Sequence, residues 1–157
     1  MAAESEKERL NRKLEELLQE LRVALPGVQV LFAFLLTIPF TGRFSRITDL
    51  QRDVYFTAFL ATAVASALLI APSAYHRIRW RYLDKETLDE KRRMLVTGGR
   101  FAASGFVFLG VATTAVVYLV TDVLFGPREA AVIAAALAAV LVWLWYALPL
   151  SRRMRDR

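Results

Sequence analysis

Four long runs of apolar residues, separated by polar segments, dominate the pattern of this chain. The runs cover 23–40, 54–75, 101–120 and 130–150, and none of them contains Asp, Glu, Lys or Arg. An α-helix rises about 1.5 Å per residue, so about 20 apolar residues cross a hydrocarbon layer that is ~30 Å thick. The pattern predicts an all-α fold, a four-helix transmembrane bundle (23–150) with spans at about 23–41, 54–76, 101–121 and 130–150.

The N-terminal segment (1–22) has the period of an amphipathic helix. Its apolar positions are spaced by four, three and four residues: Leu10, Leu14, Leu17 and Leu21. Glu, Lys and Arg fill the other faces. Three placements are open: the stripe lies among lipid headgroups, pairs with a second subunit, or packs on the chain's own middle connection. Because Pro26 and Gly27 follow the stripe, we expect an elbow before the first span.

The middle connection (76–100) is predicted to contain a second polar helix. Acidic residues come early and basic residues late in 84–93, which suits the helix dipole. We expect Gly98 and Gly99 to end this helix before the third span. A basic tail (151–157) follows the fourth span.

Basic residues are divided unevenly between the polar segments. Of the 21 Lys and Arg residues, 17 lie in 1–22, 76–100 and 151–157, and four lie in 41–53 and 121–129. Four spans place the first three segments on one face of the membrane, and the positive-inside rule assigns that face to the cytoplasm. We therefore predict a multi-pass membrane protein with both termini cytoplasmic.

The basic face is predicted to meet anionic lipid headgroups or a membrane-protein partner. Its basic residues flank spans and are interleaved with Glu and Asp, without a recognisable nucleic-acid-binding module, so we expect no nucleic-acid partner. Alanines at small-xxx-small spacing on the second and fourth spans favour a homo-oligomer. The candidate lipid or partner face consists of Arg77, Arg79, Trp80, Arg81, Arg92 and Arg93.

Catalytic and metal chemistry lack the residues that they need. The chain has no cysteine and a single histidine, and it carries no phosphate loop or nucleophile motif. We therefore expect neither an enzyme, a metal site nor a cofactor.

Ion transport is the alternative function, and the spans offer few ionisable side chains for an ion path. No span holds the carboxylate or basic side chain that transporters commonly place near the midplane. The side chains left for a cation or proton path are Gln29, His76, Thr37 and Asp122. His76, with an ordinary pKa of about 6.5, could relay protons, and it would meet Gln29 if the first two spans are neighbours. Asp53 and Asp122 are expected in a surface ion-pair network with Arg43, Arg46, Arg52 and Arg128.

The segments LLQELRVALPGVQVLFAFLL (17–36) and APSAYHR (71–77) resemble an uncharacterised bacterial family of small four-span membrane proteins. Some members of that family are automatically labelled sodium:proton antiporter. The resemblance covers most of the chain and implies the bacterial inner (plasma) membrane. Two hypotheses follow: a non-catalytic, oligomeric anchor or assembly component, and a small oligomeric cation or proton channel or sodium:proton exchanger.

Overall fold

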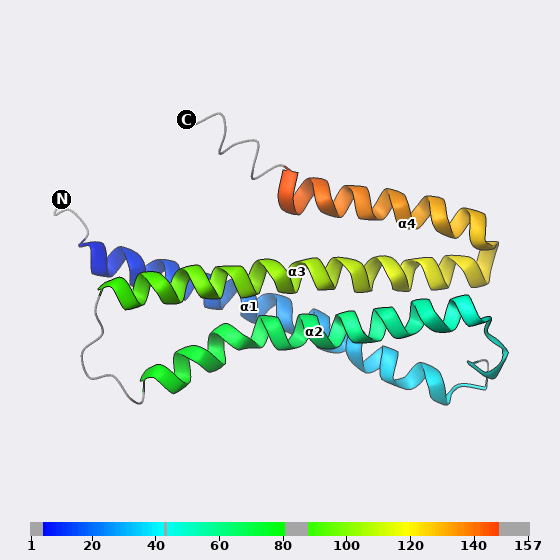
Figure 1. The fold of residues 1–157 in the computed structure, drawn as a ribbon, viewed down its shortest axis with the longest axis horizontal. Helices are drawn as coiled ribbons and strands as arrows, with labels where there is room; N and C mark the ends of the chain where they lie inside the picture. The colour runs from blue at the N-terminus through cyan, green and yellow to red at the C-terminus, as the bar shows by residue number, and fades with distance from the viewer. Residues whose placement is uncertain (1–4, 43, 81–87, 148–157) are drawn as a thin grey trace. The chain divides into compact units, whose positions relative to one another are not determined.

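The computed structural model describes residues 5–42, 44–80 and 88–147, with side chains described except at 75–80 and at 146–147. The elements in chain order (Figure 1) are α1 (Glu6–Thr37), η1 (Ile38–Phe40), η2 (Phe44–Arg46), α2 (Asp49–Trp80), α3 (Leu88–Phe125), α4 (Pro127–Val142) and the π-turn η3 (Trp143–Ala147). The predicted all-α fold is confirmed, and four helices are long and apolar enough to cross a membrane. The chain is therefore a membrane protein. The last residues of the predicted fourth span (148–150) and the basic tail (151–157) lie outside the described residues.

The chain divides into two compact units. The first unit comprises Met1–Phe34 with Thr62–Phe108, and the second comprises Leu35–Ala61 with Leu109–Arg157. Helices α1, α2 and α3 contribute residues to both units, whereas α4 belongs to the second alone.

Helix α1 continues through Pro26, so the chain does not leave the helix there, and the expected elbow stays a prediction of a bend within one helix. Pro26 lies inside the helix, and Leu21, Val28 and Leu35 are each only 1% exposed. These three residues are seven apart, so the buried stripe keeps its phase across the proline. Proline removes one intrahelical hydrogen bond, and burial of an apolar side chain of this size contributes about 1.5–3 kcal/mol. Burial on both sides of Pro26 therefore accounts for a helix that continues.

Helix α3 is also continuous, and the prediction that Gly98 and Gly99 end a helix is wrong. Glycine inside a helix costs only about 1 kcal/mol relative to alanine, which packing easily offsets. Gly98 is buried, and a methyl group there would lie 3.1 Å from Cδ2 of Leu17 and 3.6 Å from Cβ of Pro72. The space left around Gly98 measures about 10 Å³. Gly98 thus marks a close approach between helices.

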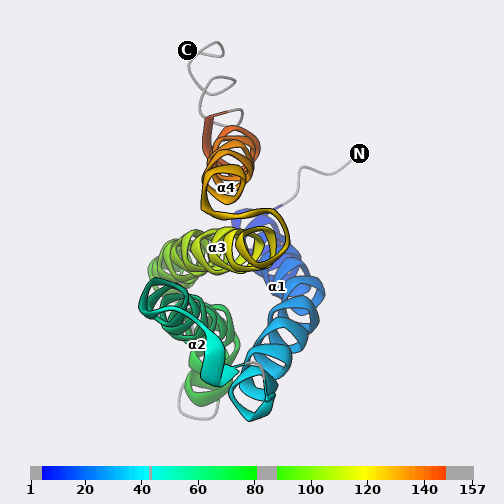
Figure 2. The ribbon, with the colours of Figure 1, turned by 90° about the vertical axis from the view of Figure 1, so that its right-hand side faces the viewer.

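In the first unit, the N-terminal stripe packs on the chain's own α3, the third of the three open placements. The start of α1 lies beside the start of α3 (Figures 1 and 2). Leu10, Leu21 and Met94 are buried. Lys91 Nζ donates a hydrogen bond of 2.6 Å to Oδ1 of Asn11, and an exposed ion pair joins Arg92 to Glu6 at 3.5 Å. The charged starts of α1 and α3 therefore pack together through buried apolar side chains. The hydrogen bond and the ion pair lie beside these side chains.

In the second unit, α3 turns into α4 over one residue. Gly126 has φ of 108°, a value that favours glycine, and Pro127 begins α4. The predicted polar connection (121–129) is thus largely helical. Helix α4 runs back beside α3 (Figures 1 and 2). Ala130 and Ala134 are its buried positions.

Candidate functional site

The second unit contains an open cavity of about 1120 Å³. Its walls come from the connection between α1 and α2, the first turns of α2 and the last turns of α3. Most lining residues are apolar, including Ile38, Leu119 and Val123, and among the lining residues that the structure describes Asp122 and Arg46 are the charged ones. The described lining therefore has an apolar wall and one charge of each sign.

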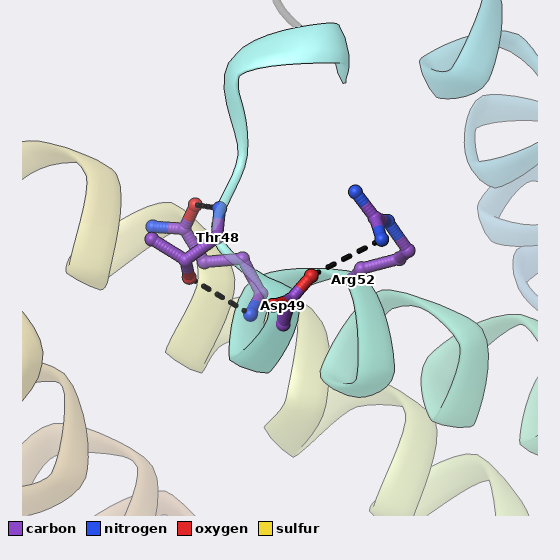
Figure 3. Close-up of polar contacts among 4 residues, drawn as sticks. Thr48, Asp49 and Arg52 are labelled. Carbon is purple, nitrogen blue, oxygen red and sulfur yellow. Dashed lines mark hydrogen bonds and ion pairs between the residues drawn. The ribbon is translucent and has the colours of Figure 1, made fainter.

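Asp122 is held in the cavity wall by the start of α2. Its side chain is half-buried, and Oδ2 accepts a hydrogen bond of 2.7 Å from Nε2 of Gln51. Gln51 also caps its own helix, because its Oε1 accepts the Thr48 N–H at 3.0 Å while its N–H donates to Oγ1 of Thr48 at 3.2 Å. This reciprocal pair is a capping box (Figure 3). The helix cap therefore fixes the side chain that orients Asp122.

The expected ion-pair network at this end has a different composition. Arg52 pairs with Asp49 at 3.1 Å (Figure 3), and both side chains are largely exposed. The described partner of Asp122 is an amide rather than an arginine. Arg43, another expected member of the network, lies outside the described residues.

Tyr55 links α2 to the end of α1. Its ring is buried against Phe44, with centroids 5.1 Å apart in an edge-on arrangement, and against Phe59 at 6.4 Å. Its hydroxyl donates a hydrogen bond of 2.8 Å to the carbonyl of Leu35. The helical donor to that carbonyl would be residue 39, which is proline and has no N–H. Tyr55 therefore satisfies a carbonyl that Pro39 leaves without its helical partner.

The four candidates for an ion path are distributed over both units. Gln29 is exposed in the first unit, and Thr37 is exposed at the end of α1 in the second. Asp122 lines the cavity, together with Thr41 rather than Thr37. The backbone of His76 is helical, but its side chain lies outside the described residues, so the predicted meeting with Gln29 stays a prediction.

The candidate lipid or partner face is described only in part. Arg92 and Arg93 are exposed near the start of α3. The side chains of Arg77, Arg79 and Trp80, and the whole of Arg81, lie outside the described residues.

Several hydroxyls along the spans bond to their own helix. Thr57, Ser66 and Thr113 each donate a hydrogen bond of 2.9 Å to the carbonyl four residues earlier. This is the common use of hydroxyls in apolar helices. Within the described part of the chain, no three His, Asp or Glu side chains gather as metal ligands would.

Sequence reasoning missed Gln51, Thr48 and Tyr55. The first two carry a readable signal, since Thr48-Asp49-Leu50-Gln51 has the spacing of a capping box ahead of an apolar run. Tyr55 has a weaker signal, a proline four residues after Leu35, which indicates an unpaired carbonyl but not its donor.

The model of a family of unknown function (DUF6328) matches residues 3–149 of the chain. The match agrees with the expected similarity to an uncharacterised family. No curated protein and no solved structure matches the chain.

Proposed function

The chain belongs to the DUF6328 family, a family of unknown function. We propose the following function from the sequence and the geometry. The protein is a non-catalytic, oligomeric anchor of the bacterial inner membrane, multi-pass with both termini cytoplasmic. Its charged cytoplasmic face binds anionic lipid and thereby presents the helical end of the protein to a membrane-protein partner. The uneven division of Lys and Arg supports this orientation.

The burial of the N-terminal stripe carries this proposal. Leu10 and Leu21 on α1 and Met94 on α3 are buried. The stripe is therefore used inside the chain and does not need lipid or a second subunit to cover it. What remains outside is a charged helical surface, with Arg92 and Arg93 exposed on α3.

The distance of these arginines from the apolar run of α3 supports contact with lipid headgroups. Arg93 precedes the apolar run at Phe101 by eight residues, which is about 12 Å along a helix axis. The headgroup layer takes up about 5–7 Å of that distance, so the remainder is shorter than the Debye length of about 8 Å at physiological ionic strength. At that range a basic residue near an anionic surface contributes about 1 kcal/mol.

A vesicle experiment tests the lipid contact. The full chain is reconstituted in phosphatidylcholine vesicles with and without phosphatidylglycerol, and the thermal unfolding midpoint is measured at low and high salt. We expect phosphatidylglycerol to raise the midpoint at low salt, because it neutralises exposed arginines. The double variant Arg92→Gln with Arg93→Gln should lose part of that gain.

The matched control is Arg52→Gln, an exposed arginine near the start of α2. This variant should keep the full gain if binding is specific to the start of α3. Equal midpoints in both vesicle types, or an equal loss for Arg52→Gln and the double variant, would refute the proposal.

A small cation or proton path is the second candidate, and the half-buried Asp122 in the cavity wall favours it. Proteoliposomes under a sodium or proton gradient test this function directly. Flux that falls in Asp122→Asn, His76→Ala or Gln29→Ala would support transport. An absence of flux under every gradient would remove it.

A further inference from the structure

We propose that the cavity of the second unit binds a zwitterionic phospholipid with a primary-amine headgroup, its ammonium at Asp122 and its phosphate at Arg46. This inference is independent of the anionic-lipid proposal, because it uses different residues and a different class of lipid.

The size and lining of the cavity favour a lipid. Pockets for small molecules usually measure about 300–1,000 Å³, and this cavity of about 1120 Å³ exceeds that range. Its apolar wall includes Ile38 and Ile47 from the connection and Leu119, Val120 and Leu124 from α3. Such a wall matches an acyl chain. Since the connection joins the ends of two apolar helices, the polar part of the cavity falls where headgroups lie.

The charges of the lining select the headgroup. Asp122 and Arg46 both line the cavity and have opposite signs. An anionic lipid such as phosphatidylglycerol could place its phosphate at Arg46 but would bring no cation to Asp122, and a cationic amphiphile could pair with Asp122 but would bring no anion to Arg46. A zwitterion satisfies both residues. The guanidinium of Arg46 suits phosphate because its planar fork can donate two parallel hydrogen bonds.

Asp122 is prepared to accept an ammonium group. Oδ2 already takes the Gln51 amide at 2.7 Å, and among the described contacts Oδ1 takes none. A primary ammonium has three N–H donors, whereas the quaternary ammonium of phosphatidylcholine has no N–H. Because Gln51 is held by the helix cap, Asp122 is oriented before a ligand arrives, which lowers the cost of binding.

Native mass spectrometry of the full chain in detergent tests this site. The protein is titrated with phosphatidylethanolamine or phosphatidylcholine of identical acyl chains, and retained lipid is counted. We expect phosphatidylethanolamine to be retained roughly tenfold or more better, because only its primary ammonium can donate hydrogen bonds to the Asp122 carboxylate. Asp122→Asn should remove this preference, and Arg46→Gln should weaken retention of both lipids. Asp49→Asn, a nearby but exposed carboxylate, should keep the preference.

Several results would overturn the site: equal retention of the two lipids by the unmodified chain, a preference that survives in Asp122→Asn, or phosphatidylglycerol retained as well as phosphatidylethanolamine. The comparison of the two lipids on the unmodified chain needs no variant, so it decides the question even if Asp122→Asn fails to fold. Soluble phosphoethanolamine should compete poorly, because it lacks the acyl part, and full competition would also overturn the proposal. The variant Arg92→Gln with Arg93→Gln should keep the preference, which separates this site from the anionic-lipid face.

Discussion

At Pro39 the chain gives up a backbone donor, and Tyr55 on α2 replaces it with a hydroxyl. In an apolar surrounding an unpaired carbonyl is costly, because no water can take the place of the missing N–H. The side chain of Gln51 makes two such hydrogen bonds: one caps the start of α2, and the other orients Asp122. At the residue scale, the second unit thus depends on side chains that complete the hydrogen bonding of backbone or neighbouring groups.

Tyr55→Phe should lower the stability of the fold by about 1–3 kcal/mol, the cost of leaving a buried acceptor unsatisfied. The ring contacts with Phe44 and Phe59 would remain, so the loss reports the hydroxyl alone. Thermal unfolding in detergent measures the effect. Tyr118→Phe is the control, since Tyr118 has no hydrogen bond among the described residues, and it should change stability little. Equal losses for both variants would contradict the assignment.

The start of α1 should depend on pH through Glu8. The Ser5 N–H donates to Oε2 of Glu8 at 2.9 Å, and the Glu8 N–H donates back to Oγ of Ser5 at 3.3 Å. The Ser5 N–H, and to a smaller extent its hydroxyl, lower the pKa of Glu8. A lowered folded-state pKa means that the cap stabilises the helix above the unfolded-state pKa and is lost as pH falls through the folded-state value. The protection factors for hydrogen exchange at the first turn, which compare each rate with the intrinsic rate at the same pH, should therefore fall in acid.

Ser5→Ala supplies the control for this pH dependence. An NMR titration of the Glu8 carboxyl should show its pKa rising part of the way towards the ordinary value in Ser5→Ala, because the hydroxyl contact is lost while the backbone N–H remains. An unchanged pKa would show that the Ser5 side chain does not help to hold the carboxylate.

At the scale of elements, the helices are longer than the apolar runs that reveal them. The apolar runs predicted all four helices, because a run of about 20 uncharged, apolar residues indicates a membrane-spanning helix. Their ends were missed, because α1 and α3 continue into charged sequence where amphipathic packing, rather than hydropathy, sustains the helix. The seven-residue spacing of Leu21, Val28 and Leu35 indicates continuity across Pro26, and it is visible in the sequence. The cavity could not be predicted, because it requires knowledge of which helix ends meet.

Gly105→Ala should disrupt the packing between α2 and α3 in the first unit. A methyl group at this position would lie 2.7 Å from Cδ2 and 2.8 Å from Cγ of Leu69, a side chain with no exposed surface. Overpacking of this kind costs about 1–3 kcal/mol. Thermal unfolding of the purified chain measures the loss.

Gly99→Ala is the matched control for Gly105→Ala. It lies on the same helix, with no atom within 4 Å of the added methyl group. Alanine there should be neutral or stabilising by up to about 1 kcal/mol, because it favours the helix. A destabilised Gly99→Ala would mean that glycine serves α3 in some way other than close packing.

At the scale of the whole molecule, the proposed orientation rests on charge. Helix lengths and apolar content make this a membrane protein, but they do not say which end faces which compartment. The uneven division of Lys and Arg gives the proposed orientation: it assigns the start of α1 to the cytoplasmic face and the connection between α1 and α2 to the opposite face.

Single-cysteine labelling should verify this topology, and the absence of native cysteines makes every introduced thiol unique. We expect Ser45→Cys to react with a membrane-impermeant maleimide on intact cells, because residue 45 is assigned to the outer face. Gln19→Cys should react only after the membrane is permeabilised. Both residues are exposed, so access within the protein is matched. Labelling of both variants from the same side would reverse or discard the orientation.

The unbroken course of α1 has a mechanical consequence. Because α1 continues as one helix past Pro26, a displacement applied near Glu6 is carried along its backbone to the segment around Val28. A protein that binds the start of α1 would thereby move the part of the molecule that sits in lipid.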